Sequence, residues 1–168
     1  SPAESRKLAL AAARRGIEID PSSPEAHAAF GYSNLYEWNW SEARESLQRA
    51  IRLNPNYAPA HLWYAHLLSA RRRFDQALGE VRLAREVDPL SPIIQTQVGW
   101  ILGHSRRYPE AMIEFRKTLK LDPNYQQSQV DGMYYFALRN YGYNLIVKEG
   151  NLEGGIYQLT LAERFGPL

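Results

Sequence analysis

The sequence predicts an all-α fold, an α-solenoid in which antiparallel helix pairs stack one behind another. Three observations support this prediction. Prolines recur at intervals of 34 residues, small residues recur with the same step, and apolar residues inside each interval follow the period of a helix. A helix pair of this length cannot bury its apolar face alone, so neighbouring pairs must stack to form a core.

The recurring prolines mark the ends of repeating units. Pro21, Pro55, Pro89 and Pro123 each follow an Asp or Asn, and an aliphatic residue stands two positions before each proline. Proline has no amide hydrogen to donate and its ring clashes with the preceding turn, so a helix stops before it. The four prolines therefore mark the C-terminal ends of four helices.

Other positions keep the same 34-residue step. Small residues let two helices approach closely, and large residues fill the neighbouring gaps. The columns of small and then aromatic residues are Gly31, Ala65 and Gly99; Ala43, Ala77 and Ala111; and Trp40, Phe74 and Tyr108.

Local signals divide the chain into helices. Residues 3–19 predict one helix, and each following unit predicts two. Ser23-Pro24 and Ser91-Pro92 are typical of an N-cap followed by proline in the first helical turn, and we expect Ser41 to cap a helix as well. The last pair is irregular, because its proline comes ten residues late. We place the extra residues near 126–135, in a lengthened first helix that Asp131-Gly132 could interrupt.

The columns resemble the signature of the tetratricopeptide repeat (TPR) family. The resemblance implies a right-handed superhelical α-solenoid whose first helices line a concave groove. Trp38 departs from the pattern, since glycine is common at this turn position. The arrangement also resembles bacterial TPR arrays fused to regulators or kinases. The expected division is the second helix of a truncated repeat (1–23), three full repeats (24–57, 58–91 and 92–125) and an atypical pair with a roughly ten-residue insertion (126–168).

The resemblance implies a binding site on the groove side of the first helices. The expected residues are almost uncharged and mostly aromatic, and such side chains offer a large contact area at a small entropic cost. The alternative interpretation is that some of these aromatic side chains pack in the core. The expected binding residues are Tyr32, Tyr36, Trp63, His66, Gln97, Trp100, His104 and Tyr141.

A protein or peptide segment is the expected partner. Some TPR proteins grip a C-terminal carboxylate with Lys, Asn and Arg. This clamp is absent here, which favours a neutral or apolar segment. The alternative function is structural: self-association into a homo-oligomer, or docking within a larger regulatory protein. The matching clamp columns hold Ala28, Tyr32, Trp63, Ile93 and Gln97.

Composition argues against several other classes of protein. The 20 basic and 18 acidic side chains leave a net charge of +2, so we expect no nucleic-acid partner. The chain has no cysteine and its histidines lack metal-site spacing, so we expect no metal or cofactor. No catalytic serine elbow or phosphate loop is present, so we expect no enzyme activity. No stretch approaches the roughly 18 apolar residues of a membrane span, and the polar start favours a cytoplasmic location.

Two runs of arginine occupy successive turns between helices. They are Arg71-Arg72-Arg73 and Arg106-Arg107. The simpler interpretation is a soluble turn whose positive charge complements the C-terminal end of the helix dipole. The alternative is a basic edge that binds an acidic partner or a phosphate group.

Overall fold

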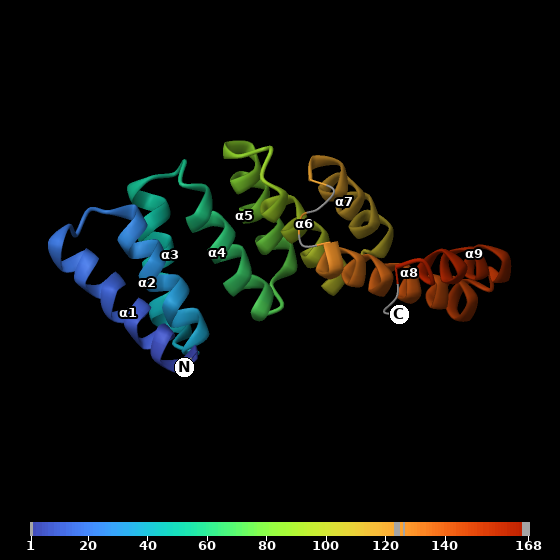
Figure 1. The fold of residues 1–168 in the computed structure, drawn as a ribbon, viewed down its shortest axis with the longest axis horizontal. Helices are drawn as coiled ribbons and strands as arrows, with labels where there is room; N and C mark the ends of the chain where they lie inside the picture. The colour runs from blue at the N-terminus through green and yellow to red at the C-terminus, as the bar shows by residue number, and fades with distance from the viewer. Residues whose placement is uncertain (1, 123–124, 126, 166–168) are drawn as a thin grey trace. The chain divides into compact units, whose positions relative to one another are not determined.

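The computed structural model describes residues 2–122, 125 and 127–165, and within them all regular structure is helical (Figure 1). The predicted fold class, an all-α solenoid of antiparallel helix pairs, is confirmed. The chain divides into two compact units after Pro89. The first unit holds α1 (Pro2–Ile19), α2 (Pro24–Tyr36), α3 (Trp40–Leu53), α4 (Ala58–Ala70) and α5 (Phe74–Val87). The second holds α6 (Pro92–His104), α7 (Tyr108–Leu121), α8 (Gln127–Glu149) and α9 (Leu152–Ala162).

Helices of the first unit pack in chain order. α1 contacts α2, α2 pairs with α3, α3 contacts α4, and α4 pairs with α5. Figure 1 shows α1 to α5 following one another in this order. α2 also contacts α4 directly. The first helices of the two pairs are therefore neighbours, and side chains on both can form one surface.

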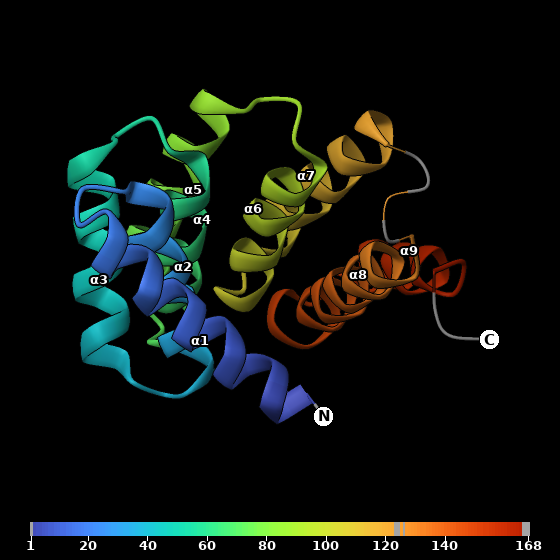
Figure 2. The same ribbon diagram turned by 60° about the vertical axis from the view of Figure 1, so that its left-hand side comes forward.

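The second unit repeats this plan with a longer helix. α6 pairs with α7, α8 pairs with α9, and α8 contacts both α6 and α7 (Figure 2). α8 has 23 residues against the 13 of α6, and it continues through Asp131 and Gly132 without a break. Again the first helices of the two pairs, α6 and α8, are neighbours.

Helix starts follow the caps predicted at two serines but not at the third. Ser23 and Ser91 cap α2 and α6, because their side chains accept hydrogen bonds from the amides of the first turn. The expectation for Ser41 is wrong. Asn39 occupies the N-cap position of α3, and its side-chain amide donates instead to Asn34, so it leaves the helix start uncapped.

The turns inside the helix pairs share one backbone conformation. Trp38, Arg72, Arg106 and Gly150 have φ angles of 62°, 59°, 65° and 66°. This left-handed conformation suits glycine and costs other residues about 1 kcal/mol or more. Trp38 therefore departs from the family pattern in sequence but not in backbone conformation, because its φ angle matches that of Gly150 in the last helix pair.

Close approach between paired helices depends on small residues. A Cβ atom on Gly99 of α6 would lie 2.7 Å from Cε1 of Phe115 on α7. A Cβ atom on Gly155 of α9 would lie 2.8 Å from the carbonyl oxygen of Gly142 on α8. The recurring alanines Ala43, Ala77 and Ala111 are fully buried. These contacts explain why the small residues recur.

We predict opposite effects of alanine at two helical glycines. Gly99→Ala is expected to lower the free energy of unfolding by about 1–3 kcal/mol, because Phe115 must move. Gly79→Ala in α5 is the matched control. Its Cβ would meet no atom within 4 Å, so the helix propensity of alanine should raise stability by up to about 1 kcal/mol. Urea unfolding of the two variants measures both changes, and equal shifts would contradict this account of the packing.

A buried histidine links two helices of the first unit. Nδ1 of His61 lies 2.7 Å from Oε2 of Glu80, and Nε2 lies 2.9 Å from the carbonyl oxygen of Pro55. Both partners accept, so both ring nitrogens must donate, which only the imidazolium form does. The hydrogen bond to Glu80 is the main cause that raises the pKa of His61, against the opposing effect of burial.

This pairing predicts a pH dependence of stability. Because the pKa of His61 is raised on folding, its contribution is fully present below the unfolded value of about 6.5 and is lost as pH rises through the folded value. Urea unfolding between pH 5.5 and 8.5, a span of about three units around that value, should show this loss in the wild type. His61→Gln should show less of this loss, because glutamine does not titrate. Glutamine is a suitable replacement, since the next repeat carries Gln95 at the equivalent position. An unchanged slope in the variant would exclude the charged pair.

Candidate functional site

Three expected binding residues of the first unit form an aromatic cluster. The ring of Tyr32 on α2 stacks on Trp63 of α4, with centroids 4.7 Å apart and an interplanar angle of 27°. The ring of Tyr36 meets Tyr32 edge-on at 5.0 Å, and the two hydroxyl oxygens lie 3.1 Å apart. The cluster therefore spans the neighbouring helices α2 and α4.

This cluster is neutral and partly open to solvent. Burial, with the hydrogen bond to Tyr36 adding to it, raises the pKa of Tyr32 to about 12. The phenol is therefore protonated across the physiological range. Trp63 is half-buried and Tyr36 is exposed. His66 lies on α4 three residues after Trp63 and is half-buried. The cluster can offer aromatic faces and a hydroxyl group to a ligand.

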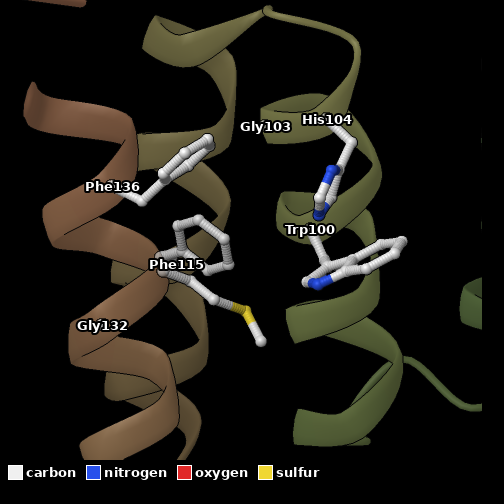
Figure 3. Close-up of a pocket in the computed structure, with 7 residues that line it drawn as sticks. Trp100, Gly103, His104, Phe115, Gly132 and Phe136 are labelled. Carbon is white, nitrogen blue, oxygen red and sulfur yellow. The ribbon is translucent and has the colours of Figure 1, made fainter. Parts of the chain in front are cut away.

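The second unit contains an apolar cavity of about 340 Å³ between α6, α7 and α8. We call it the aromatic cavity. Figure 3 shows Phe136 extending from α8 toward α6, which carries Trp100 and His104, while Phe115 of α7 lies between them. The residues that line it are Trp100, Gly103, His104, Phe115, Gly132, Met133 and Phe136.

Aromatic contacts organise the mouth of this cavity. The rings of Trp100 and His104 lie 4.0 Å apart, centroid to centroid, and that of His104 lies 6.4 Å from Phe136. Tyr108 meets the other edge of Phe136 at 6.3 Å. Gly103 and Gly132 contribute no side chain. The cavity is open because glycine lines it on both α6 and α8.

The lining of the aromatic cavity carries no charge at neutral pH. Partial burial lowers the pKa of His104, although the residue is exposed. A neutral imidazole presents one donor and one acceptor beside the apolar rings. Trp100 is half-buried and Phe136 is 40 % exposed. The cavity is therefore suited to an apolar group that brings a single polar contact.

The structure separates the expected binding residues into two sets. Tyr32, Tyr36, Trp63 and His66 belong to the first unit, whereas Gln97, Trp100, His104 and Tyr141 belong to the second. Gln97 is half-buried one turn before Trp100. Tyr141 is half-buried on α8 and does not line the aromatic cavity.

Sequence reasoning missed what α8 contributes to the cavity. The sequence predicted Tyr141 as the binding residue of this helix, because the ten extra residues were placed near 126–135. The cavity instead uses Gly132, Met133 and Phe136. Their i, i+1, i+4 spacing puts them on one helix face, which is the signal the sequence offered.

The part of the chain that the structure describes shows neither a membrane-spanning helix nor a cluster of metal-ligating side chains. None of its helices is both long enough and apolar enough to cross a membrane. Among the same residues, His, Asp and Glu side chains nowhere gather in a group of three or more that could hold a metal ion.

Comparison with known proteins agrees with the repeat pattern. Residues 35–98 match the family model of the tetratricopeptide repeat. This segment of the chain is therefore similar to tetratricopeptide repeats. No curated protein matches the sequence. Members of this family are generally interaction scaffolds without enzymatic activity.

Solved structures share the fold, two of them over nearly the whole chain. YrrB, described as a TPR protein with an unusual peptide-binding site, is 22 % identical with a TM-score of 0.69, over 99 % of this chain and 81 % of its own. PilF of Pseudomonas aeruginosa is 23 % identical with a TM-score of 0.72, and the match covers 99 % of this chain and 72 % of PilF. The TPR2B domain of yeast Sti1, solved in complex with pHsp70, is 19 % identical with a TM-score of 0.63. The match covers 68 % of this chain and 94 % of the Sti1 domain.

Proposed function

We propose that this TPR chain is a non-enzymatic interaction module that binds a protein segment by inserting an apolar side chain into the aromatic cavity. The observation that carries the proposal is the cavity itself. Its volume of about 340 Å³ falls within the range of about 300–1,000 Å³ typical of ligand pockets. The aromatic rings at its mouth are only partly covered, so an inserted group would bury further apolar surface.

The chemistry of the lining favours a neutral anchor such as Leu, Met or Phe. Each square ångström of apolar surface removed from water contributes about 25 cal/mol. A charged anchor would lose its hydration without gaining an opposite charge, because His104 is neutral. The clamp columns also lack lysine and arginine, so a terminal carboxylate would find no ion pair there.

The first unit offers a second contact surface. The stacked pair Tyr32 and Trp63 is formed by α2 and α4, just as the aromatic cavity is lined by α6 and α8. Aromatic anchors of this kind commonly dominate the energy of an interface. Peptide binding by YrrB and the Sti1 complex with pHsp70 support the use of this fold for such a role. We expect a partner that contacts both units to bind more tightly than one confined to the cavity.

Filling the cavity should abolish binding without harming the fold. Gly132→Leu adds a side chain where a Cβ meets no atom within 4 Å, and it improves helix propensity. Peptides selected against the wild type from a random library should lose binding to this variant in isothermal titration calorimetry. Trp100→Ala should weaken the same peptides by about thirtyfold, corresponding to an anchor worth about 2 kcal/mol.

Trp38→Ala is the matched control for these variants. Trp38 is 73 % exposed and lines neither the aromatic cavity nor the first-unit cluster. Its loss should leave affinity unchanged. If the selected peptides bind Gly132→Leu as tightly as the wild type, the aromatic cavity is not the binding site.

Self-association is the second candidate function. Tyr143 and Val147 on α8 and Leu152, Ile156 and Tyr157 on α9 are all more than half exposed. Contiguous exposed apolar surface commonly marks an interaction site. Each helix carries an i, i+4 pair among these residues, so each presents an apolar face to solvent. A second copy of the chain is one partner that could cover them.

Sedimentation equilibrium distinguishes this candidate. If the α8–α9 pair drives self-association, the wild type should gain mass with concentration and the double variant Val147→Lys, Ile156→Lys should remain monomeric. Leu8→Lys is the control, since Leu8 is equally apolar and 71 % exposed on α1. A wild type that stays monomeric throughout the concentration series would exclude self-association.

A further inference from the structure

A second cavity, of about 480 Å³, lies in the first unit where α3 and α4 meet. We call it the arginine cavity. We infer that it binds an anionic side chain, a phosphoryl group or a carboxylate, carried by a protein partner. The residues that line it are Trp40, Ser41, Arg44, Leu67, Leu68, Arg71 and Arg73.

Three helices bring the arginines together. Arg44 belongs to α3, Arg71 is the C-cap residue of α4, and Arg73 is the N-cap residue of α5. The packing of α3 on α4 and of α4 on α5 places all three around one space. Leu67 and Leu68 are almost fully buried and provide an apolar wall. Beside such a wall, a charge is screened less than in open water, so its interactions are stronger.

These guanidinium groups are not neutralised within the protein. In the described part of the chain, Arg44, Arg71 and Arg73 form no side-chain hydrogen bond and no ion pair with an acidic residue. Three like charges around one cavity raise the local positive potential. A bound anion would relieve that repulsion and gain charge-assisted hydrogen bonds.

The next repeat shows what is missing at Arg73. Arg107 stands 34 residues further on, and its Nε and Nη2 atoms donate to the two carboxylate oxygens of Glu110. The position equivalent to Glu110 is Gln76, which has no charge. The same turn therefore holds a paired arginine in one repeat and an arginine available to a ligand in the other.

The remaining lining suits an oxyanion. A guanidinium group presents planar paired donors that match the oxygens of a carboxylate or phosphoryl group. Ser41 lines the same space and adds a hydroxyl donor. α3 begins here, and its N-cap residue Asn39 makes no capping hydrogen bond, so the positive end of the helix dipole adds to the potential.

A protein partner fits this site better than a nucleic acid does. The chain carries a net charge of only +2, whereas polyanion binding draws on an extended positive surface. The three arginines here line one cavity of about 480 Å³ rather than an extended surface. This inference is independent of the aromatic cavity, because all of its residues belong to the first unit.

The test uses three fluorescein-labelled peptides of equal length in fluorescence polarisation. One carries a single phosphoserine, one carries a run of glutamates, and one carries glutamines at the same positions. We expect the phosphoserine or the glutamate peptide to bind at least about tenfold more tightly than the glutamine peptide. Comparison of the first two identifies which oxyanion the cavity prefers.

Two variants that lose the same number of positive charges distinguish binding in the arginine cavity from long-range attraction by the charge of the whole protein. The triple variant Arg44→Gln, Arg71→Gln, Arg73→Gln should lose at least about tenfold in affinity for the anionic peptide. The control triple Arg82→Gln, Arg106→Gln, Lys120→Gln removes the same charge at exposed positions outside the cavity. It should lose no more than about threefold, through weaker long-range attraction.

Gln76→Glu gives a test that leaves every arginine in place. The new carboxylate should pair with Arg73 as Glu110 pairs with Arg107, and so compete with the anionic peptide. We expect weaker binding with a melting temperature that does not fall, because the new carboxylate gains a partner in Arg73 and lies in the first turn of α5. Equal losses in the two triple variants, equal binding of all three peptides, or tighter binding of a labelled oligonucleotide would each overturn the inference.

Discussion

The structure depends on the close approach of the two helices in each pair. A helix pair buries only part of its apolar surface, so the core forms by stacking pairs whose contact positions hold glycine or alanine. Gly99 against Phe115 and Gly155 against Gly142 leave no room for a Cβ atom. This steric requirement explains the columns of small residues and gives each pair a defined geometry.

That geometry places the first helices of successive pairs next to each other within each unit. Their facing side chains form the surfaces available to a ligand. In the first unit, Tyr32 of α2 and Trp63 of α4 stack on each other. In the second, Gly103 and Gly132 leave the space between α6 and α8 open as the aromatic cavity. The same packing rule thus yields a stacked aromatic contact in one unit and a cavity in the other.

Polar residues at equivalent positions of two repeats also differ in their hydrogen-bond partners. His61 donates to both Glu80 and Pro55, while Gln95 takes the same position in the next repeat and donates to Glu114. Repeat proteins can vary such positions because each repeat contacts only its neighbours. The same buried position can therefore hold a histidine–carboxylate pair in one repeat and an amide–carboxylate hydrogen bond in the next.

The sequence by itself determined the fold class, the caps at Ser23 and Ser91 and the helix boundaries near the prolines. These features follow from local rules, because helical periodicity, capping and the missing amide of proline act within a few residues. The tertiary structure decided which side chains meet across helices. The 34-residue step could not show that Phe136 completes a cavity with Trp100, since the longer α8 breaks the register. Nor could the sequence show that Arg44 lies beside Arg71 and Arg73, because that contact depends on how α3 packs against α4.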